Sequence, residues 1–417
     1  MSGNKKQPLV PRLRFPEFKN TAEWQSPTLG EVSEPVEERV GERKLTPVSI
    51  SAGIGFVPQA EKFGRDISGS QYKLYTVVRD GDFVYNKGNS LKFPQGCVYD
   101  LQGWGEVAAP NVFICFRLKN GYENGFYRQC FERNVHGIQL RKHITSGARS
   151  NGLLNISKEA FYGVAIPVPS HAEQQKIADC LSSLDDLIAA ETYKLDTLKT
   201  HKKGLMQQLF PREGETVPRL RFPEFREAGE WKPKTIGNSC ESFSGGTPST
   251  TNKSFYGGEI PFIRSAEIDK VKTELFLTNE GLENSAAKLV RAGDILVALY
   301  GANSGDVALS KINGAINQAI LCLRHETSDR FVYQYLSHKK EWIIATFIQG
   351  GQGNLSGEII KAISLFFPNP SEQEHIADCL SSLDDLITAQ TQKIDALKTH
   401  KKGLMQQLFP VLDEVGA

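Results

Sequence analysis

Hydrophobic residues recur at alternating spacings of four and three in two long stretches, residues 173–211 and 372–410. This heptad pattern predicts one long α-helix in each stretch, with a hydrophobic seam along one side. The seam positions of the first stretch are Ile177, Leu181, Leu184, Ile188, Glu191, Leu195, Leu198, Lys202, Leu205 and Leu209. Those of the second are Ile376, Leu380, Leu383, Ile387, Gln390, Ile394, Leu397, Lys401, Leu404 and Leu408. Ser170 and Ser371 are predicted N-caps, and Pro211 and Pro410 follow the predicted helix ends.

The two stretches are nearly identical in sequence. They share 32 of 39 residues, and both contain KTHKKGLMQQLFP. A shorter motif is repeated as well, as PRLRFPEFKNTAEW at 11–24 and PRLRFPEFREAGEW at 218–231. The inserts between these motifs show no comparable similarity. The chain is therefore a tandem duplication in which the long and short motifs match and the inserts between them have diverged.

Charge is distributed unevenly along both predicted helices. The acidic residues of the first part are Asp179, Asp185, Asp186, Asp378, Asp384 and Asp385. The basic residues of the last part are Lys199, Lys202, Lys203, Lys398, Lys401 and Lys402. An antiparallel pair would bury both seams and place opposite charges beside each other, so the pattern favours that arrangement. The alternative is that each helix packs separately on its own domain.

The inserts show a different pattern, with short hydrophobic runs separated by glycine-containing turns, which is typical of mixed α/β domains. RDGDFVYNKGNS (79–90) and RAGDILVALYGANSG (291–305) predict the same turn, buried strand and loop in both inserts. The predicted fold class is α+β, with two mixed α/β domains, two long antiparallel coiled-coil helices and a pseudo-two-fold axis. The predicted segments are a first domain at 1–172, a helix at 173–211, a second domain at 212–371, and a helix with its tail at 372–417.

The composition of the chain excludes several classes of protein. The 417 residues are 40% hydrophobic and 23% charged, as in globular proteins. No apolar run is long enough to span a bilayer, and the N-terminus lacks the apolar core of a signal peptide, so we expect a cytoplasmic protein. The seven cysteines are scattered and form no C-x-x-C pair, which argues against a disulfide framework and a zinc site.

Sequence motifs of catalysis are absent. The chain has no G-x-x-x-x-G-K-[ST] phosphate loop, no H-E-x-x-H and no G-x-S-x-G. It also lacks the Asn/Asp-Pro-Pro-aromatic run that an amino-methyltransferase would need. We therefore predict no catalytic residues and no metal ligands in this chain.

Basic and polar loop residues are the positive signal in the inserts. The stretch 128–150 is rich in Arg and Lys and is interpreted as a helix face that lies along DNA phosphates. Other loops carry Asn, Gln and Ser, whose side chains suit hydrogen bonds to base edges, although each loop also fits an ordinary turn. The predicted DNA-binding residues are Asn86, Lys87, Asn89, Ser90, Arg128, Arg141, Lys142, Arg149, Arg264, Asn303, Ser304, Gln318, Gln352 and Asn354.

Taken together, these features resemble the DNA specificity subunit of Type I restriction-modification systems. The resemblance lies in EQQKIADCLSSLDDLI, the doubled KKGLMQQLF and SGGTPSTTNKSFYGGEIPFIRSAEI (244–268), which looks like the opening of a target-recognition domain. The first insert lacks such a TPS-type opening. The resemblance covers almost the whole chain and implies two target-recognition domains, each reading one half of a bipartite DNA site, with the helices setting the gap.

The resemblance also implies partners. Two modification subunits would methylate adenine with S-adenosylmethionine, and motor-nuclease subunits would join to cut unmodified DNA. S-adenosylmethionine, ATP and magnesium are therefore expected in the partner subunits and not in this chain. A net charge of only +1 is low for a protein that binds DNA alone, which fits partners that supply phosphate-binding charge. The alternative functions are a coiled-coil scaffold that joins two protein-binding modules and an enzyme with an unrecognised site, such as a stand-alone nuclease.

Overall fold

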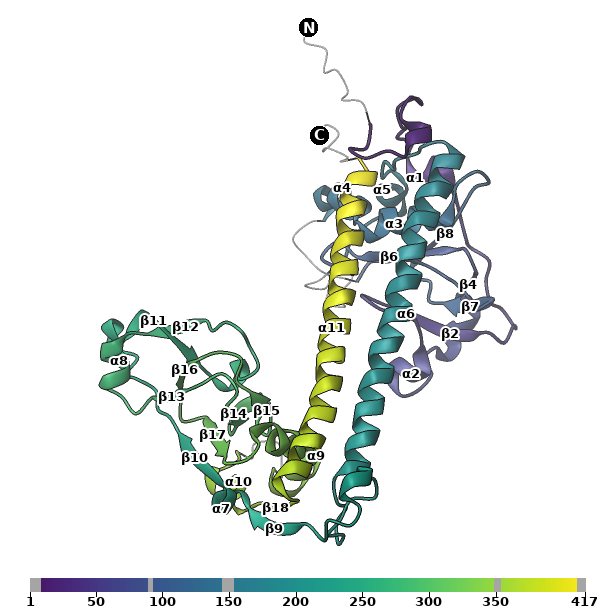
Figure 1. Cartoon of the computed structure of the whole chain (residues 1–417). Helices are drawn as coiled ribbons and strands as arrows, with labels where there is room; N and C mark the ends of the chain where they lie inside the picture. The colour runs from purple at the N-terminus through teal and green to yellow at the C-terminus, as the bar shows by residue number, and fades with distance from the viewer. Residues whose placement is uncertain (1–8, 89–92, 145–153, 349–353, 411–417) are drawn as a thin grey trace. The chain divides into compact units, whose positions relative to one another are not determined.

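The structure is a computed structural model that describes residues 9–88, 93–144, 154–348 and 354–410. The chain divides into two compact units. Unit 1 comprises residues 1–191 and 393–417, and unit 2 comprises residues 192–392. Both long helices cross this division, since α6 spans His171–Leu209 and α11 spans Pro370–Leu408 (Figure 1). The units therefore do not follow the four predicted segments, because each unit takes part of both helices.

Unit 1 contains two four-stranded sheets and several short helices. Its strands are β1 (Ser33–Pro35), β2 (Thr46–Ser51), β3 (Gly55–Pro58), β4 (Thr76–Arg79), β5 (Phe83–Asn86), β6 (Cys97–Asp100), β7 (Glu106–Ala109) and β8 (Ile114–Leu118). Its short helices are η1 (Pro16–Phe18), α1 (Leu29–Val32), α2 (Gln59–Phe63), η2 (Gly69–Leu74), α3 (Asn124–Glu132), α4 (Val135–Leu140), η3 (Arg141–His143) and α5 (Lys158–Tyr162).

Unit 2 has the same kinds of elements. Its strands are β9 (Lys232–Thr235), β10 (Cys240–Ser244), β11 (Tyr256–Ile263), β12 (Leu275–Leu277), β13 (Lys288–Val290), β14 (Ile295–Ala298), β15 (Val307–Leu309), β16 (Gly314–Ile316), β17 (Ile320–His325) and β18 (Ser364–Phe367). Its remaining helices are η4 (Pro223–Phe225), α7 (Ile236–Ser239), η5 (Lys253–Phe255), η6 (Ser265–Glu267), α8 (Asn279–Glu283), η7 (Gly301–Asn303), α9 (Asp329–Phe347) and α10 (Gly357–Ala362).

Both units share one sheet topology although their inserts differ in sequence. The sheet orders β1-β8-β5-β6 and β3-β2-β7-β4 in unit 1 match β10-β17-β14-β15 and β12-β11-β16-β13 in unit 2. The second sheet of each unit has one parallel pair, β2 with β7 and β11 with β16, and antiparallel partners on either side. The strands β5 and β14 are buried, as their continuous hydrophobic sequences require. The predicted equivalence of 79–90 and 291–305 is confirmed for the turn and the strand, since β5 and β14 hold the same place in their sheets, and residues 89 and 90 lie outside the described residues.

The predicted antiparallel coiled coil is confirmed inside each unit. None of the twenty seam residues is exposed. In unit 1 the Lys401 ammonium lies 2.8 Å from a carboxylate oxygen of Asp185, so the end of α11 lies beside the first part of α6. In unit 2 the equivalent pair, Lys202 and Asp384, is 2.6 Å apart. The ion pairs at equivalent positions of both copies agree with the direction that the charge pattern favours.

In unit 1 the short motif ties the start of one long helix to the end of the other. Arg14 donates two hydrogen bonds of 2.7 Å to the carboxylate of Glu173 in the first turn of α6. The neighbouring Leu13 N–H donates to the Gln407 carbonyl near the end of α11 (2.9 Å). The Arg14 side chain is 7% exposed and that of Glu173 is 1% exposed, so the ion pair is buried. The motif therefore fixes both helix ends together.

Unit 2 repeats this arrangement with the second copy of the motif. Arg221 donates two hydrogen bonds of 2.7 Å to Glu372 in the first turn of α11. The Leu220 N–H donates to the Gln208 carbonyl near the end of α6 (3.0 Å). The hydrogen bonds to Glu372 raise the pKa of Arg221 above its ordinary value. Repetition of PRLRFPEF is thus explained by a contact that each unit needs once.

The predicted helix caps are half right. Ser170 caps α6, because its hydroxyl accepts the Glu173 N–H (3.3 Å). Ser371 does not cap α11, because Asn369 accepts the Glu372 N–H (3.0 Å) and Pro370 occupies the first helical position. A proline is favourable there, since the missing N–H would have no intrahelical partner. No helix in the described part of the chain is long and apolar enough to cross a bilayer.

Candidate nucleic-acid interface

Three loops of unit 2 meet at one end of the strands of the β10-β17-β14-β15 sheet. β14 ends there and β17 begins, and the Leu299 N–H donates to the Ala319 carbonyl (2.8 Å). The end of β10 joins them through the Gly245 N–H, which donates to the Asn317 carbonyl (3.2 Å). Only glycine fits at this position, since a Cβ on Gly245 would lie 1.8 Å from the Ile316 carbonyl oxygen. We call this end of the strands, with the loops that meet there, the loop edge of unit 2.

Three predicted DNA-binding residues come from the loops that start or end at this edge. Asn303 and Ser304 lie between β14 and β15, and Gln318 lies two residues before the first residue of β17. Gln318 is exposed, whereas Asn303 and Ser304 are half-buried. The structure brings the loops that carry these predicted residues to one side of the sheet.

Two further predicted residues reach the same edge from other segments. Arg264 follows β11, whose last residue Ile263 pairs with Ile316 at the end of β16. Asn354 is exposed and precedes Leu355, whose N–H donates to the carbonyl of the residue that follows β14 (2.9 Å). Gln352 lies outside the described residues. The five described predictions in unit 2 thus share one edge, although they are spread over 90 positions of sequence.

The side chains of Asn303 and Ser304 are turned into their own loop. Asn303 donates from Nδ2 to a carboxylate oxygen of Asp306 (3.1 Å), and the Ser304 hydroxyl donates to the Leu299 carbonyl (2.8 Å). These bonds close the loop between β14 and β15. Both residues are therefore better suited to holding the loop's shape than to contacting a base themselves.

Gln318 and Arg264 remain available to a ligand at the loop edge. Gln318 accepts from the Thr247 hydroxyl (2.7 Å), which leaves its amide N–H groups free of that contact. Arg264 is paired with Glu267 (2.9 Å) and Glu274 (2.5 Å), and both hydrogen bonds raise its pKa. The Arg264 side chain is still 37% exposed, so it can turn toward a phosphate.

Unit 1 has the equivalent edge at the end of β5. Asn86 donates to the Ile50 carbonyl (2.7 Å) and accepts the Gly88 N–H (2.7 Å), so its side chain shapes the turn. The Lys87 carbonyl accepts the Leu154 N–H (2.9 Å), as the carbonyl after β14 does in unit 2. The predicted residues Asn89, Ser90 and Arg149 lie outside the described residues.

Arg128 lies away from this edge. It binds Asp100 at two points, with distances of 3.0 Å and 2.9 Å. Asp100 ends β6, whereas Asn86 pairs with Cys97 at the other end of that strand. Arg128 is thus at the opposite end of the hairpin from Asn86 and Lys87.

The described part of the basic stretch, residues 128–144, does not form a single helix face. Asn134 adopts a left-handed conformation (φ 60°) that separates α3 from α4. Arg133 lies over the ring of Phe409 (5.1 Å), and His136 is buried, which lowers the pKa of His136 to about 4. Arg141 and Lys142 are exposed in η3 and remain candidates for phosphate contact.

One ion pair recurs at the opposite end of both central sheets. Arg324 binds Asp294 in unit 2 (2.8 Å), and Arg117 binds Asp82 in unit 1 (2.6 Å). Burial opposes ionisation of Asp294, but the hydrogen bonds from Arg324 and the Arg291 N–H outweigh it and lower the pKa. These pairs fix the turn before β5 and β14 and so hold each sheet in register.

Sequence reasoning missed two residues at the loop edge. Thr247 orients Gln318, and Tyr300 is 38% exposed at the start of the loop that contains Asn303. Thr247 is the threonine of the TPS sequence at 247–249. In LYGANSG (299–305) a tyrosine stands between a hydrophobic strand and a glycine, where an exposed side chain is expected. Both patterns can be seen in the sequence, although neither predicts which side chain of the loop is exposed to a ligand.

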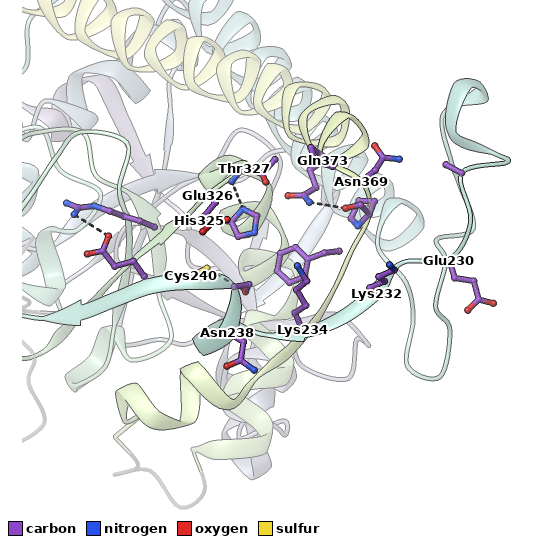
Figure 2. A pocket seen from close by; sticks show the side chains of 17 residues that line it. Glu230, Lys232, Lys234, Asn238, Cys240, His325, Glu326, Thr327, Asn369 and Gln373 are labelled. Carbon is purple, nitrogen blue, oxygen red and sulfur yellow. Dashed lines mark hydrogen bonds and ion pairs between the residues drawn. The ribbon is translucent and has the colours of Figure 1, made fainter.

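A pocket of about 830 Å³ lies elsewhere in unit 2 (Figure 2). Lys232 and Lys234 of β9, His325 at the end of β17 and Gln373 of α11 line it. The His325 Nδ1 accepts the backbone N–H groups of residues 327 (3.3 Å) and 328 (3.1 Å), and burial and the nearby Lys234 lower its pKa. The ring stacks on Phe367 at 5.2 Å. This imidazole therefore holds the turn before α9, whose N-cap is Ser328.

The pocket does not resemble a catalytic site. Three glutamates, Glu230, Glu241 and Glu326, offset the lysines at its walls. In the described part of the chain, no three His, Cys, Asp or Glu side chains are placed to hold a metal ion. The pocket also lies at the end of β17 that is opposite to the loop edge. The loop edge is therefore the better candidate for a binding surface.

The inserts and the long helices both fall within matches to a known protein family. The model for the Type I restriction modification DNA specificity domain matches residues 79–200 and 228–399. The chain belongs to this family. It carries two copies of the domain, one in each half of the duplication, and it is a DNA specificity subunit and not an enzyme in its own right.

Relatives and solved structures agree with this assignment. The chain is 26% identical over 357 residues to a specificity subunit ascribed to the type I restriction enzyme MjaX of Methanocaldococcus jannaschii, covering 82% of this chain and 81% of that one. It is 25% identical over 253 residues to the EcoR124I/EcoR124II specificity subunit of Escherichia coli, covering 57% and 59%. The crystal structure of the S subunit from M. genitalium has the same fold, with a TM-score of 0.61 at 13% identity, covering 97% and 100%.

Proposed function

We propose that unit 1 and unit 2 each read one half of a bipartite DNA site. The observation that carries this proposal is the loop edge, which recurs in both units with the same topology and different residues. Equal topology gives both halves the same way of approaching a duplex. Different loop residues let the two half-sites differ in sequence.

The two long helices act as the spacer between the half-sites. A helix of 39 residues is about 58 Å long, which exceeds one turn of B-DNA at about 34–36 Å. The buried pairs Arg14–Glu173 and Arg221–Glu372 anchor each helix start, so the helices are well suited to set a fixed gap. A duplex whose half-sites are separated differently would then be rejected.

The catalytic functions belong to partner subunits. Two adenine-methylating modification subunits dock on this chain, and motor-nuclease subunits join the complex through them. S-adenosylmethionine, ATP and magnesium are held by those partners. The partners also supply phosphate-binding charge that this chain, at net +1, does not carry. A complex that acts on cellular DNA works in the cytoplasm of its host.

Methylation sequencing tests this function. The chain is co-expressed with the modification subunits of its own system in a host that lacks adenine methylation. We expect one bipartite motif, with a methylated adenine in each half, throughout the host DNA. Unmethylated DNA, or a single continuous motif, would contradict the proposal. Retention of a binding partner without any DNA selectivity would favour the scaffold function instead.

Partner docking predicts a second result, which concerns two exposed leucines. Leu187 and Leu386 occupy equivalent positions of α6 and α11 and are 40% and 54% exposed, whereas the seam residues beside them are half-buried. Each is interpreted as the centre of one docking site. The change Leu187→Asp or Leu386→Asp should remove one modification subunit of two, and the double variant should remove both. Native mass spectrometry of the purified complex measures this stoichiometry.

An exposed leucine away from the long helices provides the control. Leu74 is 48% exposed in η2, so Leu74→Asp should leave both modification subunits bound. If the double variant still carries two modification subunits, the docking sites lie on another surface.

A further inference from the structure

We propose that Tyr300 is a specificity-determining residue that contacts the DNA half-site read by unit 2, and that Lys340 is a positioning residue for it. This inference rests on the proposed function and identifies which side chain of the loop edge does the reading. It is carried by the loop between β14 and β15, residues 299–306, all of which the structure describes.

Tyr300 is the large side chain that this loop exposes. Leu299 is buried at 2% exposure, whereas Tyr300 is 38% exposed. The polar side chains that follow bond within the loop, Asn303 to Asp306 and Ser304 to the Leu299 carbonyl. A ligand that approaches the loop edge here therefore meets the tyrosine rather than the asparagine or the serine.

The loop is held in one conformation by α9. The Lys340 ammonium binds Asp306 at 2.5 Å, and the second carboxylate oxygen of Asp306 accepts from Asn303. Gly305 has a positive φ of 88°, and a Cβ there would lie 2.9 Å from Ile344 of the same helix. A loop fixed before binding loses little conformational entropy when it meets DNA. Tyr300 is thus presented by a preorganised support.

Unit 1 links the residues just before β6 to the segment after α3, with different residues. Asn134, which follows α3, donates from Nδ2 to the Gln95 side chain (3.1 Å). The Gln95 carbonyl accepts from the Tyr85 hydroxyl (2.7 Å), and β6 begins two residues after Gln95. The inserts have diverged in sequence, yet both link the residues before the next strand (β6 or β15) to the helical segment that follows β8 or β17. The presence of such a contact in both units, with different residues, is expected if the position of the loop matters for function.

Tyrosine suits contact with a specific base pair. Its ring packs on a thymine methyl group or a deoxyribose, and its hydroxyl donates to or accepts from a base edge. It brings no charge, so it adds little to sequence-independent phosphate binding. Loss of Tyr300 should therefore change which bases are preferred more than it changes total affinity.

Selection from a randomised DNA pool tests this inference with the full chain in complex with its modification subunits. For Tyr300→Ala we expect a loss of about tenfold in preference at one or two base pairs of one half-site, with the other half-site unchanged. Tyr300→Phe separates the ring from the hydroxyl and should retain the contribution of the ring. Phe276 is equally exposed at 37% in β12 of the other sheet, and Phe276→Ala should leave both half-sites unchanged.

The outcomes distinguish the inference from the function beneath it. A Tyr300→Ala complex that selects the wild-type motif with unchanged preference overturns the role of Tyr300 alone. A wild-type complex that selects no bipartite motif overturns the proposed function, and the role of Tyr300 with it. Loss of preference in both half-sites would also overturn the inference, because it would indicate general damage.

The positioning role of Lys340 has its own readout. Lys340→Met should weaken preference at the same base pairs as Tyr300→Ala, by a smaller factor of about threefold, with little change in melting temperature. Lys340→Arg keeps the ion pair with Asp306 and should restore the preference. If Lys340→Met leaves selection unchanged, or if Lys340→Arg fails to rescue it, Lys340 does not position the loop.

Discussion

Replacement of Arg221 by alanine is expected to lower the free energy of unfolding of unit 2 by about 3–5 kcal/mol. Arg221 binds Glu372 through two hydrogen bonds of 2.7 Å, and the Glu372 side chain is fully buried. Trp231 donates a third bond to the same carboxylate (3.3 Å). Removing the guanidinium would leave this carboxylate buried without a cation. Hydrogen exchange of unit 2 amides along a denaturant series measures the loss.

The same motif contains a matched control. Arg219 lies two residues from Arg221, is 54% exposed and pairs with Glu215 at the surface. Arg219→Ala should cost less than about 1 kcal/mol, because exposed ion pairs contribute little. Arg221→Lys should recover only part of the stability, since lysine cannot form the two-point contact. Equal losses for Arg219→Ala and Arg221→Ala would contradict the role of the buried pair.

The second large effect concerns Phe409, near the end of the chain. Its ring stacks on Phe126 (centroids 5.0 Å apart) and meets Trp24 edge-on (6.3 Å), so residues from both ends of the sequence form one core. Truncation of a buried phenylalanine costs about 3–5 kcal/mol. Phe409→Ala should therefore destabilise unit 1, although most of unit 1 lies more than 200 positions earlier. Limited proteolysis with mass analysis of the fragments reports which unit opens.

Phe210 is the counterpart of Phe409 in the duplication and serves as its control. It stacks on Tyr335 (4.3 Å) and contacts Phe331 (5.8 Å), all within unit 2. Phe210→Ala should open unit 2 and leave unit 1 protected, the reverse of Phe409→Ala. If both variants open the same unit, the division of the helices between the units is wrong.

The long helices and the repeated strands could be predicted because their signals are periodic and local. A heptad seam is covered wherever two such helices pair, so its positions can be predicted without knowledge of the inserts. The charges of Lys401 and Asp185 favour one direction of packing. The cap of α11 could not be chosen on composition alone, since Asn369 and Ser371 both have suitable side chains. The choice depends on Pro370, which the first helical turn accepts.

The candidate site was predictable at the level of loops and not of side chains. Asn303 and Ser304 have the right chemistry for base edges, but Asp306 and a backbone carbonyl engage them first. Short polar residues commonly bond their own loop in this way, and a composition-based reading does not detect it. Similarly, one left-handed residue, Asn134, interrupts the basic stretch that the sequence suggested as a helix face. Contacts between distant segments decide these cases.

The division of both long helices between the units has a consequence for biosynthesis. Unit 2 is a continuous segment, 192–392, so it can form once residue 392 has left the ribosome. Unit 1 needs Met405, Leu408 and Phe409 in its core, and these are translated after the whole of unit 2. At about 5–20 residues per second, the N-terminal half waits roughly 10–40 s for its final helix. Unit 1, which begins first in the sequence, is therefore the unit whose core is completed last.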